Sequence, residues 1–281
     1  MKFTLGFSPC PNDTFIFDAL VNKKIDTGDF EFETVLEDVQ TLNRWAIAGK
    51  LNISKISYGV LPLVLTHYKM LHSGGALGKG VGPLLISGSP VDIHTPGFNI
   101  NEYTIAIPGE NTTAHLLFSQ AFPQAKNKVF KVFHEIEDFL LSTKDKKTLG
   151  VIIHENRFTY QNKGLFKLID LGDFWEKQTG YPIPLGGIAI KNNIQANVQQ
   201  TVDRLINESI AYAFHHYPFL PDYIKQHSQE MEETVMRQHI DLYVNNYSLD
   251  IGDDGKKAVN EFLNIYERNN GLSPINHNVF I

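Results

Sequence analysis

LGVIIHENRFTY, residues 149–160, is the stretch of this sequence that says most about its fold. Residues 149–153 are apolar or glycine, and a run of this kind is typical of a strand buried on both faces. His154 follows the run directly. Ligands of open α/β sheets bind at the carboxyl ends of such strands, so the stretch predicts an α/β fold with a titratable side chain at its ligand-binding edge. The alternative interpretation is a histidine that only caps the strand.

The remainder of the chain continues this alternation of strands and helices. Strands are predicted at 2–8, 30–35, 53–57, 82–87, 103–107 and 129–133. Helices are predicted at 14–22, with Asp13 or Thr14 as the cap, and at 39–49, 58–68, 113–122 and 135–141. From about residue 198 onward the apolar residues keep a helical period. The pattern predicts an α/β fold with largely parallel sheets.

Two Gly- and Pro-rich stretches predict a division into two lobes. They span residues 82–90 and 180–188, and we interpret each as a crossing between lobes. Residues 1–88 together with 188–281 are then a discontinuous first lobe, and residues 89–187 an inserted second lobe. A ligand cleft is expected between them.

Composition and charge narrow the functional class. The chain has 281 residues and a formal net charge of −6, which argues against a nucleic-acid partner because such proteins present a basic face. Cys10 is the one cysteine, so an intrachain disulfide is excluded. We see no secretory signal, and no apolar stretch reaches the roughly 18 residues of a membrane span. The prediction is a cytoplasmic protein without a membrane span.

Three loops predict sites for an anionic ligand. Residues 8–14, 55–58 and 108–114 each follow a predicted strand and open a helix with hydroxyl or acidic residues. Free N–H groups and the positive end of the helix dipole bind carboxylates and phosphates at such places. Thr112 and Thr113 add two hydroxyl donors. Helix capping is the alternative interpretation for each loop, because Ser and Thr are preferred caps.

Other chemistries find little support in the sequence. The Gly-rich run 73–82 lacks the Walker spacing, since Ser73 stands where the first glycine belongs and Gly80 where Ser or Thr belongs. The histidines form no metal-binding spacing, so no metal is predicted. Cys10 lies between two prolines, and a structural role is favoured over a nucleophilic one.

Six strings, taken together, resemble the 1,4-dihydroxy-6-naphthoate synthases, menaquinone-biosynthesis enzymes of the futalosine pathway. The strings are SPCPNDTF (8–15), KIS (55–57), GGALGKGVGP (74–83), PGENTTA (108–114), GVIIHENRFTY (150–160) and PLGG (184–187). The resemblance implies a two-lobed fold like that of the type II periplasmic binding proteins. Each lobe would be a mixed sheet flanked by helices.

The resemblance also implies a reaction and its residues. A carbon–carbon lyase step would convert cyclic dehypoxanthinylfutalosine to 1,4-dihydroxy-6-naphthoate and dihydroxyacetone, without metal or organic cofactor. His154 would be the proton acceptor, and the substrate, a small aromatic carboxylate, would be bound by Lys55, Ile56, Ser57, Thr112 and Thr113. An ordinary imidazole has a pKa of about 6.5, which suits proton acceptance near neutral pH.

Two rival functions remain open at this stage. One is the sister enzyme of the same pathway and fold that dehydrates chorismate. The string at 8–15 and the histidine string at 150–160 favour the later step. The other is a binding protein for a small carboxylate, since a fold does not fix a function. Such a receptor would be exported, and it would tolerate loss of His154. The oligomeric state is not predicted.

Overall fold

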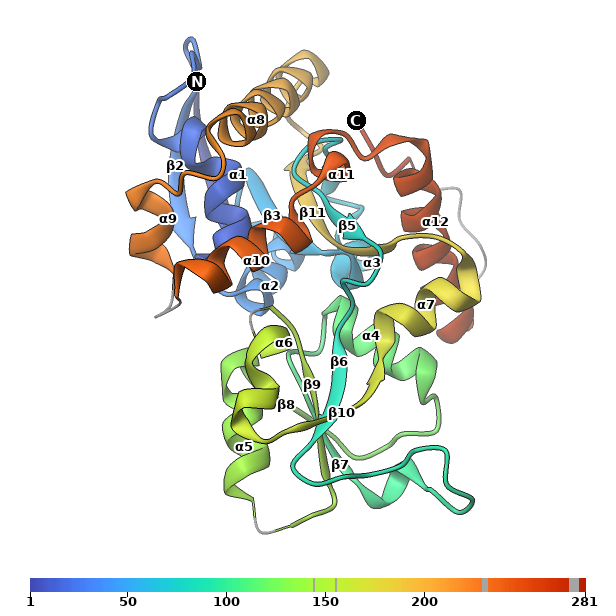
Figure 1. The fold of residues 1–281 in the computed structure, drawn as a ribbon. Helices are drawn as coiled ribbons and strands as arrows, with labels where there is room; N and C mark the ends of the chain where they lie inside the picture. The colour runs from blue at the N-terminus through green and yellow to red at the C-terminus, as the bar shows by residue number, and fades with distance from the viewer. Residues whose placement is uncertain (144, 155, 229–231, 273–277) are drawn as a thin grey trace. The chain divides into compact units, whose positions relative to one another are not determined.

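The computed structural model describes residues 1–281 except 144, 155, 229–231 and 273–277. The chain divides into two compact units (Figure 1). Unit 1 comprises Met1–Gly78 with Pro184–Ile281, and unit 2 comprises Lys79–Ile183. Each has its own mixed sheet flanked by helices.

The sheet of unit 1 is built around a parallel core. Its strands run in the order β2-β1-β3-β11-β4, with β5 paired to β11. Both β2 and β3 lie parallel to β1, whereas β11 is antiparallel to β3 and β4. The strands are β1 (Lys2–Phe7), β2 (Glu31–Leu36), β3 (Ile53–Ser57), β4 (Tyr68–Met70), β5 (Ala76–Gly78) and β11 (Ile183–Lys191).

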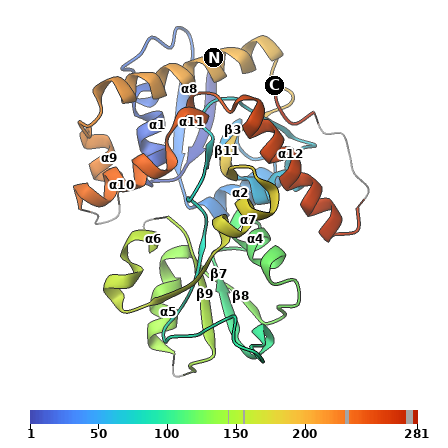
Figure 2. The ribbon, with the colours of Figure 1, turned by 45° about the vertical axis from the view of Figure 1, so that its right-hand side comes forward.

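Helices cover this sheet, and most come from the C-terminal part of the chain as predicted. They are α1 (Pro11–Val21), α2 (Val39–Ile47), η1 (Tyr58–Val60), α3 (Leu61–Val64), α8 (Ala196–His216), α9 (Asp222–His227), α10 (Glu233–Tyr243), α11 (Asn246–Leu249) and α12 (Gly252–Asn269). α1 is buried almost all round because it packs against α8, α9 and α10 as well as the sheet (Figure 2). The rings of Phe7 and Phe17 lie 4.5 Å apart in the core between β1 and α1.

Two helix predictions in unit 1 were wrong in detail. α1 begins at Pro11 with Cys10 at the N-cap, not at Thr14, because proline supplies a helical φ and needs no N–H partner at the first position. The predicted helix over 58–68 breaks into η1 and α3, and Tyr68 belongs to β4. The Tyr68 hydroxyl donates to the Leu51 carbonyl at 2.7 Å, a contact that local periodicity does not reveal.

The second Gly/Pro-rich stretch contains the boundary between the two units, at residues 183 and 184, as predicted, and it also contains a strand that was not predicted. Its residues 183–188 lie in β11, hydrogen-bonded to β3. The glycines there permit close packing: a Cβ on Gly186 would lie 2.7 Å from the Ile56 carbonyl oxygen, and one on Gly187 would lie 2.7 Å from the Tyr58 hydroxyl. Glycine in a strand commonly marks such close approach.

The sheet of unit 2 has the order β10-β6-β9-β7-β8. β9 lies parallel to β7 and antiparallel to β6, so this sheet is also mixed and not largely parallel. The strands are β6 (Leu84–Ser87), β7 (Thr104–Ile107), β8 (Lys128–Phe130), β9 (Thr148–Ile152) and β10 (Phe166–Asp170). Every residue of β9 is buried, as the apolar run predicts. β6 was expected in the first lobe, but it is hydrogen-bonded between β9 and β10 of unit 2.

Helices lie on both faces of the unit 2 sheet (Figure 1). They are η2 (Ile100–Glu102), α4 (Thr113–Ala121), η3 (Phe133–Glu135), α5 (Ile136–Ser142), α6 (Asn156–Thr159), η4 (Tyr160–Lys163) and α7 (Leu171–Thr179). α5 and α6 lie on one side, and α4 and α7 on the other. α7 was not predicted, although Asp170 caps it by accepting the N–H groups of Gly172 and Asp173, and Gly180 ends it at φ 75°.

Candidate functional site

The carboxyl ends of β1 and β3 carry a buried polar cluster in unit 1. Asp13 lies in the first turn of α1, directly after β1, and Lys55 lies near the end of β3. The Lys55 Nζ is 3.0 Å from Asp13 Oδ1 and donates to the Gly74 carbonyl at 3.0 Å. Lys55 is 5% exposed and Asp13 2%. Since the two strands are parallel neighbours, their ends meet at one edge and bring the pair together.

Further donors complete the environment of the Asp13 carboxylate. Ser8 donates its backbone N–H at 3.2 Å and its hydroxyl at 2.7 Å to Oδ2. Asn12 Nδ2 donates to Oδ1 at 2.9 Å. A buried charge is tolerated when it is paired and hydrogen-bonded in this way. The sequence alone predicted Asp13 only as a possible helix cap, and the structure makes it the direct partner of the predicted site residue Lys55.

Ser57, at the end of β3, is held by a residue that sequence reasoning missed. Its N–H donates to Asn43 Oδ1 at 2.9 Å, and Asn43 Nδ2 donates to the Ser57 hydroxyl at 3.0 Å. Asn43 lies on the buried face of α2 beside Leu42 and Ala46. A polar residue on the apolar side of an amphipathic helix is the signal that would have found it. Ile56 is fully buried, and it pairs with Gly187 of β11, so neither its side chain nor its backbone is exposed in this structure.

The N-terminus of α4 contains the predicted threonines of unit 2. Thr112 is the N-cap, and its hydroxyl accepts from the His115 N–H at 3.2 Å and donates to the Gly109 carbonyl at 2.9 Å. Capping, the alternative interpretation, therefore describes what this hydroxyl does. Thr113 is the first residue of α4 and is 4% exposed. The first turn of a helix presents backbone N–H groups without intrahelical partners, so a ligand can be bound there by amides.

A histidine with a lowered pKa, His115, lies in this turn. His115 Nδ1 donates to the Glu110 carbonyl at 2.7 Å, and Lys128 Nζ donates to His115 Nε2 at 3.3 Å. Burial lowers the pKa of His115 below its ordinary value, and the charge of Lys128 lowers it further. Burial also lowers the pKa of Lys128. Its ammonium is held by the Ser119 hydroxyl at 2.8 Å.

His154 lies two residues beyond β9, at the edge where the sheet presents its carboxyl ends. β9 and β7 are parallel neighbours, and β7 leads into the loop that ends at Thr112. The edge of one sheet therefore positions both the histidine and the threonines in unit 2. The His154 side chain is partly exposed, and its ring meets the Phe133 ring edge-on at 5.0 Å. Glu155, a second titratable residue of this string, lies outside the described residues.

The His154 backbone has an uncommon conformation. Its φ is 55°, in the left-handed region, and its carbonyl accepts from the Arg157 N–H at 3.2 Å. Non-glycine residues seldom adopt positive φ, and histidine is among those that tolerate it best. Such strain of about 1–3 kcal/mol persists where the surroundings determine the conformation, and it concentrates at functional sites.

Comparison with known proteins identifies the family to which the chain belongs. The sequence model of a family described as "Menaquinone biosynthesis" matches residues 3–268. This chain belongs to the menaquinone-biosynthesis family. It is 40% identical over 258 residues to the 1,4-dihydroxy-6-naphthoate synthase of Thermus thermophilus, covering 91% of this chain and 90% of the relative. It is 38% identical over 265 residues to the enzyme of the same name from Streptomyces coelicolor, covering 92% and 90%. The family resemblance predicted from the six strings is confirmed.

Solved structures support the predicted fold class of this menaquinone-biosynthesis family member. A protein from Archaeoglobus fulgidus matches with a TM-score of 0.88 at 29% identity, covering 96% of this chain and 98% of that one. A Candida albicans protein described as having the generic periplasmic binding protein fold matches with a TM-score of 0.64 at 11% identity, covering 99% and 97%. The α/β fold of the periplasmic-binding-protein type, with a mixed sheet in each unit, is confirmed.

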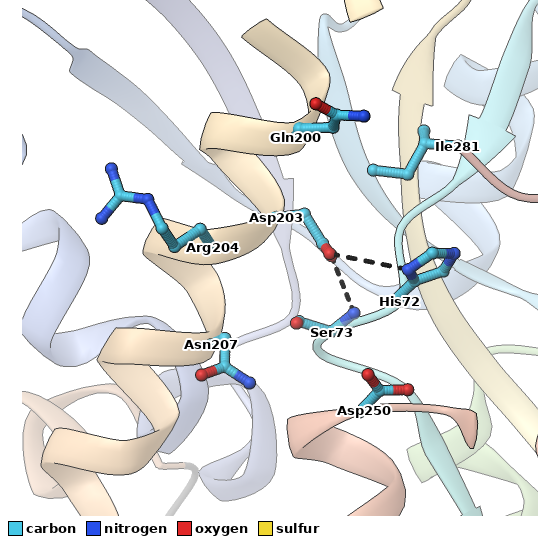
Figure 3. Close-up of a pocket in the computed structure, with 8 residues that line it drawn as sticks. All are labelled: His72, Ser73, Gln200, Asp203, Arg204, Asn207, Asp250 and Ile281. Atoms are coloured by element: carbon cyan, nitrogen blue, oxygen red, sulfur yellow. Dashed lines mark hydrogen bonds and ion pairs between the residues drawn. The ribbon is translucent and has the colours of Figure 1, made fainter. Parts of the chain in front are cut away.

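A pocket of about 320 Å³ in unit 1 has none of the predicted site residues in its lining (Figure 3). Asp203, on α8, accepts from the Ser73 N–H at 2.8 Å and lies 3.9 Å from His72 Nδ1. Burial raises the pKa of Asp203. Asn207 donates to the Leu249 carbonyl at 2.8 Å. These polar groups join α8 to the chain around residue 72, and we interpret the pocket as structural.

Two further properties concern the residues that the structure describes. None of their His, Cys, Asp and Glu side chains gather in groups of three or more suited to a metal ion. No helix formed by them is long and apolar enough to cross a membrane.

Proposed function

We propose that this chain is a 1,4-dihydroxy-6-naphthoate synthase that acts in the cytoplasm. It would cleave a carbon–carbon bond of cyclic dehypoxanthinylfutalosine to give 1,4-dihydroxy-6-naphthoate and dihydroxyacetone. The observation that carries the proposal is the 40% identity, over nine-tenths of both chains, to a relative of that name. The buried charged cluster in unit 1 and the histidine at the sheet edge of unit 2 suit a polar aromatic substrate.

His154 is the general base in this proposal. Cleavage of a carbon–carbon bond beside an oxygenated carbon requires a group that takes a proton. The imidazole follows β9, is partly exposed, and has its orientation limited by the Phe133 ring. General-base catalysis of this kind contributes about 100- to 10,000-fold in rate.

The predicted substrate-binding residues of each unit have donors to offer in this proposal. Lysine has three N–H donors, of which Lys55 gives one to Asp13 and one to Gly74, and the third would bind a substrate oxygen. Ile56 and Ser57 would contribute at the end of β3. Thr112 and Thr113 would bind through the amides of the first turn of α4, because the Thr112 hydroxyl is engaged in the cap.

The deciding experiment is a product assay with a matched pair of variants. The purified protein is incubated with cyclic dehypoxanthinylfutalosine, without added metal or cofactor, and 1,4-dihydroxy-6-naphthoate is measured by mass spectrometry. His154→Asn is the test variant, because asparagine tolerates positive φ and cannot act as the base. His94→Asn, at an exposed histidine of unit 2, is the control.

The outcomes separate the base from the reaction. We expect product from the wild type and the control, and turnover at least about 100-fold lower with His154→Asn. Equal turnover in both variants would remove His154 as the base. A wild type that dehydrates chorismate, or that only binds an aromatic carboxylate, would replace the proposed reaction with one of its rivals.

A further inference from the structure

Glu137 is a fully buried carboxylate in α5 that the proposed reaction does not use. Its Oε2 accepts from Asn156 Nδ2 and from Lys163 Nζ, the latter at 2.7 Å. Asn156 lies two residues after His154, at the start of α6. We propose that Glu137 is a positioning residue that fixes the His154 imidazole by anchoring Asn156. This inference rests on the proposed role of His154 as the base.

Packing alone does not explain a carboxylate at this position. Ile136 and Leu140 of the same helix are buried against the sheet, where a leucine at 137 would also pack. Burying a charge costs several kcal/mol before its partners compensate, and replacing a buried ion pair by apolar residues is often neutral or stabilising. What the carboxylate provides is a directed hydrogen bond to the loop that carries His154.

Gly150 brings α5 close enough for this contact. A Cβ on Gly150 would lie 2.6 Å from Ile136 Cγ2 and 3.0 Å from Leu140 Cδ1, so no larger residue allows the helix to lie as near to β9. His154 follows the same strand. The segment that enters α5 touches the imidazole through Phe133, and the helix holds Asn156 through Glu137.

A second anchor holds the next residue of the loop. Arg157 donates to the carbonyls of Gly80 and Gly82 and forms an ion pair with Asp170 at 2.8 Å. Asn156 is thus tied to α5, and Arg157 is tied to the end of β10 and to Gly80 and Gly82. These two anchors, two and three residues after His154, constrain where its backbone can go.

The left-handed backbone conformation of His154 explains why the two anchors matter. Without them the residue would relax toward a negative φ, because a residue other than glycine is strained at positive φ. That relaxation would change the direction of the imidazole. Misplacement of a reacting group by about 1 Å can cost about 100-fold in rate. Loss of the Glu137 anchor should therefore act on turnover more than on substrate binding.

The test compares two substitutions of Glu137 with a neighbouring control. For Glu137→Leu we expect kcat to fall about 10- to 100-fold with KM changed less than about threefold. For Glu137→Gln we expect kcat within about threefold of the wild type, because the amide oxygen still accepts from Asn156. Asp138→Asn, at the exposed next residue of α5, should leave both constants unchanged.

Asn156→Ala removes the same hydrogen bond from the other side and keeps the inference testable if Glu137→Leu does not fold. We expect the same selective loss of kcat. Wild-type kcat in Glu137→Leu or in Asn156→Ala would overturn the positioning role. An equal loss in Glu137→Gln and Glu137→Leu would do the same, because it would assign the effect to charge and not to the anchor.

An NMR measurement separates this inference from the proposed reaction. The imidazole signal of His154 is identified by its disappearance in His154→Asn. We expect that signal to shift in Glu137→Leu and to stay in place in Asp138→Asn. If the wild type makes no product but the signal shifts, the proposed reaction fails and the positioning role stands. An unmoved signal in Glu137→Leu overturns the positioning role even if the reaction is confirmed.

Discussion

The Asp13–Lys55 cluster of unit 1 and the His154 loop of unit 2 differ in how deeply their functional side chains are buried and in what holds them. In the cluster, two opposite charges are buried at 2% and 5% exposure, and each is held by further hydrogen bonds. In the loop, the imidazole is partly exposed on a strained backbone, and its anchors lie at the following residues. Both lie at the carboxyl ends of parallel neighbouring strands.

This contrast links the chemical role of each region to its energetics. A charge that binds an oxygen profits from a rigid, buried setting, and the protein stabilises it with permanent partners. A base that exchanges protons must stay accessible, so its support comes from the side chains of the residues that follow it. We therefore expect substitutions in the cluster to act mainly on stability and those in the loop mainly on turnover.

The largest expected effect on stability is in the cluster. Asp13→Ala leaves the Lys55 ammonium buried without its anion, and we expect the free energy of unfolding to fall by about 3–5 kcal/mol in urea titrations. The double variant Asp13→Ala with Lys55→Met should recover most of that loss, because it removes both charges. A single-variant loss below about 1 kcal/mol would mean that the pair behaves like a surface pair.

Gly150→Ala should affect both quantities, since this glycine sets the distance of α5 from β9. We expect a loss of about 1–3 kcal/mol in the free energy of unfolding from overpacking against Ile136. Turnover should fall with it, as α5 carries Glu137. Combining it with Ile136→Ala relieves the contact, so the double variant should be less destabilised than the sum of the two single variants. Simple additivity would contradict the close approach.

His154→Gly tests the same comparison in the loop, where we expect turnover to fall and stability to be kept. Glycine adopts positive φ without strain, and we expect the free energy of unfolding to stay the same or rise by up to about 1 kcal/mol. Turnover should be lost, because the base is gone. Thermal and urea unfolding beside the product assay measure both quantities. A clear loss of stability would show that the His154 side chain contributes packing that outweighs the backbone strain.

The smallest expected effect is a pH dependence beside α4. Burial and Lys128 lower the pKa of His115 in the folded protein, whereas the unfolded chain has the ordinary value of about 6.5. The unfolded state therefore binds the proton more readily, and the free energy of unfolding should fall as the pH drops below about 6.5. His115→Gln should make that slope shallower between pH 8 and pH 5. An unchanged slope would place the acid sensitivity elsewhere.

The sequence by itself determined the features that depend on local patterns. The apolar run at 149–153 predicts a buried strand because such a run suits burial on both faces, and β9 confirms it. The prediction of strand 53–57 matches β3 in full. The six strings predicted the family, because short stretches of consecutive residues that serve one site can be recognised in the sequence without knowledge of the fold.

The tertiary structure alone decided which distant groups meet. Asp13 pairs with Lys55, Asn43 with Ser57, and Glu137 with Asn156. It also made a strand of residues 183–191, directly at the predicted crossing between the two units. Periodicity reports which face of an element is buried, but not which element covers it. The partner of a buried polar group depends on sheet order and on how closely two backbones approach, and only the folded chain determines these.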